Sequence, residues 1–284
     1  MLFDIIVCDK MKEILKRLDE GEISIEECET LLKAESIREL DDVAKFDSSR
    51  KDRTGFPEAI LAESKDYDDL LTIIKGLFEE DSNGEFDLKD NIIITRLSKE
   101  RFNLLNQDLS YLLEKGIKFD YNPQARILII YKDKLVDFKK EYGKIGVLTA
   151  GTSDIAIAEE AKVIVEQGGC EVLSSYDIGV AGIHRLFPQI AYMVEQEVSA
   201  FIVCAGMEGA LPSVVAGLVD VPVIAVPTSV GYGIGADGKA ALYSMLQSCA
   251  PGLSVVNIDN GFGAGVCALT IAKNIARKVE LAKK

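Results

Sequence analysis

The second half of the chain alternates short apolar runs with longer stretches of helical pattern. Five apolar runs follow one another at regular intervals: Ile145–Leu148, Glu171–Ser174, Ala200–Val203, Val223–Val226 and Ser254–Val256. Continuous apolar strands separated by helices indicate a parallel sheet that is covered on both faces. We therefore predict an α/β fold for residues 141–284, a Rossmann-like three-layer domain with a mainly parallel sheet and right-handed crossovers.

The first half has a less regular pattern. Residues 9–46 read as helical, with a capping box formed by Ser24 and Glu27, and residues 46–58 read as a polar loop. Strands and helices then alternate: strand Ala59–Ala62, helix Asp66–Glu79, strand Asn91–Thr95, helix Lys99–Lys115 and strand Arg126–Tyr131. We expect a smaller α/β N-terminal domain over residues 1–140, joined to the second half by the charged segment 132–144.

Composition narrows the range of functions. The chain has 284 residues, of which 48% are hydrophobic, so it can bury the cores of one large or two small domains. Its formal net charge of -14 argues against binding nucleic acid or an anionic membrane, because both need clustered basic residues. We see neither a signal peptide nor a long apolar run, and the six cysteines form no CxxC pair. We expect a cytoplasmic protein with free thiols and no membrane span.

Glycine-rich polar loops follow four of the five predicted strands of the second half. They cover residues 149–154, 204–209, 227–233 and 257–265. All four lie at the carboxyl ends of strands, which form the edge where open parallel sheets bind ligands. Backbone N–H groups and helix N-termini at that edge suit phosphate. The first loop lacks the GxGxxG fingerprint of dinucleotide-binding domains, so the loops predict a phosphate-binding edge of another type.

Four side chains near these loops are candidates for chemistry. His184, the sole histidine, is either a proton carrier or a surface residue. Glu208 interrupts the apolar run 201–219, as a general base or as an acid at a helix N-terminus. Cys204 and Cys249 are each either a nucleophile or a packed thiol, and position alone does not separate them.

Six segments together resemble the LarB family, the pyridinium-3,5-biscarboxylic acid mononucleotide synthases. They are GTSD at 151–154, DIGVAGIHRL at 177–186, AGMEGALPSV at 205–214, GLVDVPVIAVPTSVGYG at 217–233, SCAPGL at 248–253 and VVNIDNGFGAG at 255–265. The similarity extends more weakly to DSSRKDRTGFPEAI at 47–60 and ITRLS at 94–98. The catalytic half of this family is similar to the AIR carboxylase (PurE) fold.

The resemblance implies an activity and roles for three residues. The family carboxylates C5 of the pyridinium ring of nicotinic acid adenine dinucleotide with CO2 and cleaves the phosphoanhydride, which releases AMP, during biosynthesis of the nickel-pincer cofactor. By this resemblance Cys249 forms a covalent adduct with the ring, Glu208 is the base and His184 handles protons or holds CO2. The implied substrate-binding residues are Gly151, Thr152, Ser153, Asp154, Ala205, Gly206, Met207, Ser229, Gly231, Asn257, Asp259, Asn260, Gly261 and Gly263.

Alternatives and partners follow from the same resemblance. The purine enzymes of the fold carry SAHRTP where this chain has AGIHRLF at 181–187, and their chemistry uses no cysteine. Aminoimidazole ribonucleotide carboxylase or mutase is thus the alternative activity, and a non-catalytic nucleotide sensor is a third. The related enzymes are octamers with fourfold symmetry, so we expect a homo-oligomer. The sequence shows no dedicated metal-ligand cluster, so we expect no firmly bound cofactor. Mg²⁺ is the one candidate, because it often neutralises the bridging phosphates of a nucleotide.

Overall fold

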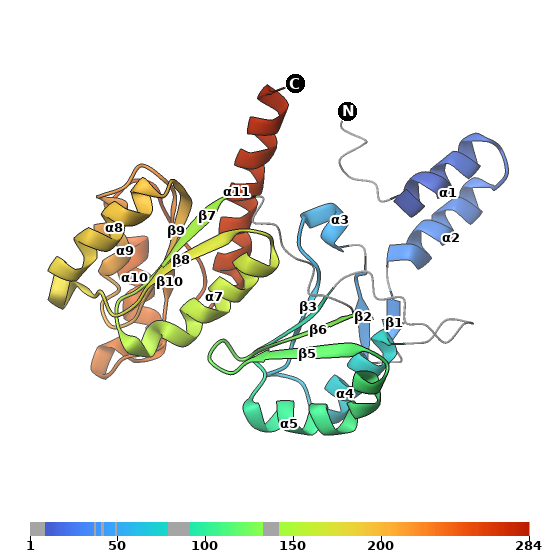
Figure 1. Ribbon diagram of the computed structural model, residues 1–284, viewed down its shortest axis with the longest axis horizontal. Helices are drawn as coiled ribbons and strands as arrows, with labels where there is room; N and C mark the ends of the chain where they lie inside the picture. The colour runs from blue at the N-terminus through green and yellow to red at the C-terminus, as the bar shows by residue number, and fades with distance from the viewer. Residues whose placement is uncertain are drawn as a thin grey trace. The chain divides into compact units, whose positions relative to one another are not determined.

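The computed structural model describes residues 9–36, 38–40, 43–48, 50–78, 91–132 and 142–283 (Figure 1). The chain divides into two compact units: Met1–Asn122 with Ile127–Leu135, and Pro123–Arg126 with Val136–Lys284. Most of the charged segment predicted over 132–144, and the predicted helix end at Glu79, lie outside the described residues. Among the helices in the described ranges, none has both the length and the apolar character needed to cross a membrane.

The N-terminal unit begins with the helices α1 (Asp9–Asp19) and α2 (Ile25–Ser36). The predicted capping box is confirmed, because Ser24 N donates to the Glu27 carboxylate at 2.9 Å and Glu27 N donates to Ser24 Oγ at 3.1 Å.

The prediction of helix up to residue 46 is wrong beyond α2. The strands β1 (Arg38–Leu40) and β2 (Ala44–Phe46) form an antiparallel hairpin there. Leu40 is buried in the core of this unit, and Ala44 and Phe46 pack against that core. Tertiary packing therefore selects the extended conformation over the local helical pattern.

A four-stranded sheet organises the rest of this unit. It contains β3 (Ala59–Leu61), β4 (Ile92–Thr95), β5 (Ile117–Asn122) and β6 (Ile127–Lys132), in the order β3-β4-β6-β5. The pair β3–β4 is parallel and the other two pairs are antiparallel. The strand β5 was not predicted, because a strand that alternates polar and apolar residues carries no continuous apolar run. The other three strands, β3, β4 and β6, correspond to the strands predicted at Ala59–Ala62, Asn91–Thr95 and Arg126–Tyr131.

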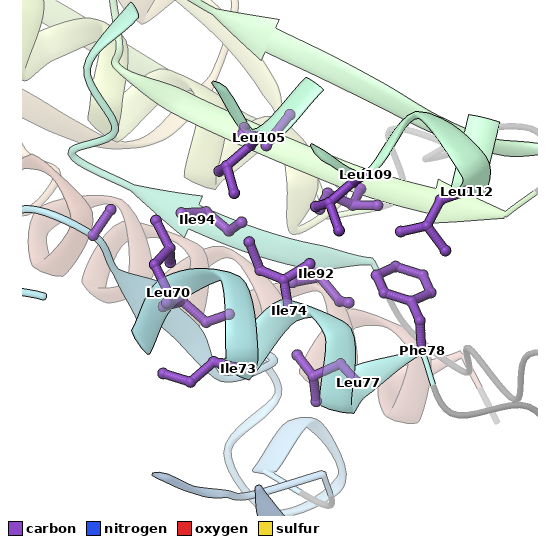
Figure 2. Close-up of a cluster of buried hydrophobic side chains, with 14 of the residues drawn as sticks. Leu70, Ile73, Ile74, Leu77, Phe78, Ile92, Ile94, Leu105, Leu109 and Leu112 are labelled. Atoms are coloured by element: carbon purple, nitrogen blue, oxygen red, sulfur yellow. The ribbon is translucent and has the colours of Figure 1, made fainter. Parts of the chain in front are cut away.

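Helices cover one face of this sheet. They are α4 (Tyr67–Leu77), α5 (Lys99–Asp108) and α6 (Ser110–Glu114), so the helix predicted over 99–115 is broken at Leu109. Figure 2 shows side chains of α4, including Leu70 and Ile74, packed with Ile92 and Ile94 of β4 and with side chains of α5 and α6. The predicted polar loop over 46–58 contains a short helix, α3 (Arg50–Thr54), which has no buried residues.

The C-terminal unit contains the predicted parallel sheet. Its five strands, in the order β11-β10-β9-β7-β8, all pair in parallel. They are β7 (Lys144–Thr149), β8 (Glu171–Ser175), β9 (Val198–Ala205), β10 (Val223–Pro227) and β11 (Leu253–Val255). Each predicted apolar run of the second half contributes one of these strands, so the α/β fold class is confirmed.

Helices cover both faces of this sheet (Figure 1). One face carries α8 (Leu186–Glu195), α9 (Leu211–Ala216) and α10 (Lys239–Leu246), and the other carries α7 (Ile155–Gln167) and α11 (Gly261–Ala282). Successive residues of β9 point to opposite faces. Phe201 and Val203 pack with α8–α10, so Ile202 and Cys204 face α7 and α11. The result is the predicted three-layer arrangement.

Candidate active site

A pocket of about 460 Å³ lies at the carboxyl edge of the parallel sheet, where the loops after β7, β8, β9 and β10 meet. This is the edge at which open parallel sheets bind ligands. Eight of the residues predicted for the site line it: Gly151, Ser153, Asp154, Ala205, Gly206, Met207, Glu208 and Gly231. These residues come from the loops after β7, β9 and β10, whereas the fourth glycine-rich loop, 257–265, contributes no lining residue.

Two of these loops approach each other so closely that a glycine is required. Met207 N donates to the Val230 carbonyl oxygen at 3.2 Å. A Cβ atom at Gly206 would lie 2.1 Å from that same oxygen and 2.8 Å from Thr228 Oγ1. Any side chain at this position would force the loop after β9 away from the loop after β10, so Gly206 fixes one wall of the pocket.

Asp154 links the loops of the pocket through hydrogen bonds. Its side chain is buried, and its carboxylate accepts hydrogen bonds from Gly151 N at 2.8 Å and from Thr228 Oγ1 at 2.6 Å. Burial raises the pKa of this carboxyl, and hydrogen bonds from Thr228, Gly151 and Gly206 oppose the rise. Because Gly151, Gly206 and Thr228 belong to the loops after β7, β9 and β10, the carboxylate is suited to fixing these three loops relative to one another.

Glu208 lies in the turn between β9 and α9 and lines the pocket. The residue at the N-cap of α9 is Ala210, so the carboxylate does not cap this helix. Its side chain is exposed. A carboxylate in this position is free to accept a proton from a ligand in the pocket.

His184 is exposed in the 3₁₀ segment Val180–Arg185, which follows β8. It is not among the lining residues, but Val180 and Ala181 of the same segment are. An ion pair of 2.7 Å joins Arg185, the last residue of this segment, to Asp177, which precedes the segment. His184 therefore stands beside the pocket without forming its wall.

The remaining predicted binding residues support the edge from outside the pocket. Asp259 accepts a hydrogen bond from Ser229 N at 2.8 Å and donates its own backbone N–H to the Pro227 carbonyl at 2.9 Å. The Asn260 side chain caps α11 by accepting from Gly263 N at 2.8 Å. The predicted residues outside the lining are Thr152, Ser229, Asn257, Asp259, Asn260, Gly261 and Gly263.

The two candidate cysteines have opposite environments. Cys204 is completely buried in β9, and its pKa is raised first by burial and then by the carboxylates of Asp154, Glu160 and Asp259. A thiol held in its neutral form without access is a poor nucleophile. Cys249 is exposed. Accessibility therefore favours Cys249 as the reactive thiol.

Cys249 does not line the pocket of its own chain. It precedes β11, whose first residue, Leu253, pairs with Val223, the first residue of β10. The pocket loops lie beyond Pro227, at the other end of β10, and four residues of strand span roughly 13 Å. The segment is held by a hydrogen bond of 2.8 Å from Ser213 Oγ to Ser248 Oγ. The structure therefore brings Glu208 into the pocket but leaves Cys249 near the opposite edge.

Several lining residues were not predicted: Ala150, Gly179, Val180, Ala181, Ala210, Leu211, Val230 and Tyr232. Most are apolar neighbours of predicted residues on the same loops, and the loop position alone was the available signal. Within the described residues, no group of three or more His, Cys, Asp or Glu side chains is arranged to hold a metal ion.

Comparison with known proteins agrees with this architecture. Residues 144–283 match the AIR carboxylase family, and residues 37–132 match the LarB/PurE-like N-terminal domain. An uncharacterized protein of Methanocaldococcus jannaschii is 46% identical, over 93% of this chain and 97% of its own length. The N5-carboxyaminoimidazole ribonucleotide mutase of the same organism is 37% identical, over 47% of this chain and 83% of its own length.

Among solved structures, Treponema denticola PurE is 20% identical, with a TM-score of 0.35, over 50% of this chain and 91% of that one. The family matches cover both halves of the described chain, in the order N-terminal domain and then carboxylase domain. The chain therefore belongs to the AIR carboxylase family, as a LarB-like member that carries the LarB/PurE-like N-terminal domain.

Proposed function

We propose that the protein carboxylates C5 of the pyridinium ring of nicotinic acid adenine dinucleotide with CO2 and hydrolyses the phosphoanhydride. The products are pyridinium-3,5-biscarboxylic acid mononucleotide and AMP. The observation that carries this proposal is the exposed thiol of Cys249 in a carboxylase domain that is joined to the LarB/PurE-like N-terminal domain. Carboxylation of an aminoimidazole needs no thiol, whereas carboxylation of a pyridinium ring does.

The electronic character of the ring explains why. A pyridinium carbon is electron-poor and does not attack CO2. When the thiolate of Cys249 adds to a ring carbon, the cation becomes a neutral enamine whose C5 is nucleophilic. The C5 electron pair then forms the new bond to CO2. Loss of the C5 proton and cleavage of the C–S bond restore the aromatic pyridinium and release the thiolate.

Glu208 is the base in this proposal. Its carboxylate is exposed and lines the pocket, so it is available to take the C5 proton. Asp154 also lines the pocket, but its oxygens accept hydrogen bonds from Gly151 and Thr228. His184, on the neighbouring segment Val180–Arg185, is assigned either to binding CO2 or to exchanging protons with solvent.

The proposal also requires the thiol to reach the ring. We assign this thiol to a second copy of the chain in a homo-oligomer, because Cys249 lies outside the pocket of its own copy. Its surroundings suit such a contact: Tyr243 and Leu246 of α10, which precede it, are large apolar side chains that are exposed in a single copy.

The activity is tested by incubating the purified protein with nicotinic acid adenine dinucleotide in bicarbonate buffer. We expect AMP and a doubly carboxylated mononucleotide, with the label of ¹³C-bicarbonate in the second carboxylate. The competing activity is suggested by the N5-carboxyaminoimidazole ribonucleotide mutases among the relatives, so that ribonucleotide is the parallel substrate. Turnover of the aminoimidazole alone, undiminished in Cys249→Ser, would overturn the proposal.

A further inference from the structure

One aromatic side chain stands at the rim of the pocket. Tyr232 lies in the loop between β10 and α10, and it is the sole aromatic residue among the lining residues of the described chain. It is 77% exposed. A tyrosine left in solvent at the mouth of a pocket gains nothing from packing in the unliganded protein, but it offers a flat surface to a ligand.

The backbone that carries Tyr232 is fixed on both sides. The Tyr232 carbonyl accepts a hydrogen bond from Gly235 N at 3.1 Å, and the Val230 carbonyl accepts one from Met207 N at 3.2 Å. A Cβ atom at Gly231 would lie 2.8 Å from the Gly235 carbonyl oxygen and 3.5 Å from Met207 Sδ. The loop is therefore closed tightly around the position, and the ring is presented from an anchored turn.

The size of the pocket suggests what the ring meets. Its volume of about 460 Å³ is near the lower end of the range, roughly 300–1,000 Å³, that accommodates drug-sized ligands. A dinucleotide is larger than such a ligand. If the reacting pyridinium half lies inside, next to Glu208, the other half must extend past the rim, where Tyr232 is exposed.

The lining also restricts how that half is recognised. Among the described residues that line the pocket, none is lysine, arginine or histidine. The lining residues therefore offer no cationic side chain to bind the half of the dinucleotide that extends past the rim. Stacking of its base on an aromatic ring needs no charge. Ile234, two residues further along the same loop, is also an apolar side chain left exposed, at 96%.

We infer that Tyr232 stacks on the adenine ring of the dinucleotide and so selects dinucleotide over mononucleotide substrates. This inference rests on the proposed function, because it takes the substrate to carry an adenine. It makes Tyr232 a specificity residue that contacts the leaving half of the substrate and takes no part in the chemistry at C5.

Binding measurements on four proteins test the inference. The wild type, Tyr232→Ala, Tyr232→Phe and the control Tyr192→Ala are titrated by calorimetry with nicotinic acid adenine dinucleotide and with nicotinic acid mononucleotide. Tyr192 is an exposed tyrosine of α8 outside the pocket lining. We expect Tyr232→Ala to weaken dinucleotide binding by about 5- to 100-fold and to leave mononucleotide binding unchanged. Tyr232→Phe and Tyr192→Ala should bind both ligands like the wild type.

The other outcomes contradict the inference in distinguishable ways. Unchanged dinucleotide binding in Tyr232→Ala would place the adenine elsewhere. Equal weakening of both ligands would show that the ring serves the pyridinium half or the shape of the loop. Failure of the wild type to bind either ligand would overturn the proposed function itself. In turnover assays, Tyr232→Ala should raise KM for the dinucleotide and leave kcat within about twofold of the wild-type value. This is the pattern expected for loss of a contact made equally in the ground and transition states.

Discussion

The two edges of the parallel sheet in the C-terminal unit differ in how deeply their polar and sulfur-containing side chains are buried. At the carboxyl edge, Asp154 is buried and hydrogen-bonded on both oxygens, and Cys204 is sealed inside the sheet. Near the amino edge, Cys249 is exposed. Burial at the first edge produces a rigid pocket with an unreactive thiol. Exposure at the second leaves a thiol that can react, but with no pocket of its own.

This contrast separates shape from reactivity. The groups that determine the shape of the pocket, such as Asp154 and Gly206, are held by neighbours from several loops. The groups assigned to chemistry, Glu208 and Cys249, are accessible to a ligand or to another copy of the chain. Substitutions should therefore divide into those that remove activity from a stable protein and those that loosen the protein.

The largest effect is expected from removal of the exposed thiol. Cys249→Ala should lower the rate of pyridinium carboxylation by at least about a thousandfold, because the ring is then never converted to an enamine. The free energy of unfolding should stay within about 0.5 kcal/mol of the wild-type value, since the side chain is exposed. Steady-state product formation and chemical denaturation provide the two measurements.

The buried thiol is the matched control for this variant. Cys204→Ala should keep kcat within a few-fold while losing about 1 kcal/mol of stability to the small cavity left in β9. Full activity in Cys249→Ala, or its loss in a folded Cys204→Ala protein, would reverse the roles assigned to the two thiols.

Glu208→Gln should reduce kcat by about 100- to 10,000-fold, the usual contribution of a positioned general base. Stability should change little, because the carboxylate is exposed in a turn. Glu195→Gln, at the exposed end of α8, is the matched control and should behave like the wild type. A Glu208→Gln protein with unchanged kcat would exclude this residue as the base.

Mixing the two inactive variants tests whether the edges of different copies meet. If each site combines Glu208 of one copy with Cys249 of another, random co-assembly of Cys249→Ala and Glu208→Gln chains makes about a quarter of the sites complete. Activity should then reappear at about that fraction after the variants are unfolded and refolded together. Complete absence of recovery in mixed oligomers would confine both groups to one copy.

Gly206→Ala should destabilise the protein by about 1–3 kcal/mol, because the new methyl group would lie 2.1 Å from the Val230 carbonyl oxygen. Gly217→Ala is the control: its Cβ would meet no heavy atom closer than 3.5 Å, so denaturation should reveal little change. Equal stability of the two variants would mean that the loops after β9 and β10 separate easily.

The smallest effect concerns the pH dependence of stability. The pKa of Asp154 is raised by burial, so the folded state holds this proton more tightly than the unfolded state. The contribution is fully present below the unfolded pKa, near 3.8, and is lost as pH rises through the higher folded pKa. In the wild type, this group should therefore make the free energy of unfolding fall as pH rises from about 4. In Asp154→Asn that fall should be absent, as measured by urea denaturation from pH 4 upward. A slope unchanged from the wild type would assign the decline to other groups.

Much of the fold and part of the site follow from the sequence. The apolar runs that became β7, β9 and β10 are buried on both faces, so their pattern is continuous and unambiguous. The β1–β2 hairpin and β5 depend on contacts distant in sequence, which no local pattern encodes.

The order of elements along the sequence carries a signal for the position of Cys249. Every pocket loop follows a strand, whereas Cys249 precedes β11, so the order of elements already puts it at the other edge. The exposure of Tyr232 and the burial of Cys204 are properties of packed loops and layers, and they become visible with the structure alone.

The covalent role of Cys249 is tested most directly by mass spectrometry of the intact protein and its peptides, after reaction with nicotinic acid adenine dinucleotide and bicarbonate and rapid quenching. We expect a mass increase equal to a bound pyridinium nucleotide on the peptide containing Cys249, and none on the peptide containing Cys204. The adduct should be absent from Cys249→Ala. Product formed without any adduct at Cys249, or an adduct on another cysteine, would contradict the assignment of Cys249 as the covalent catalyst.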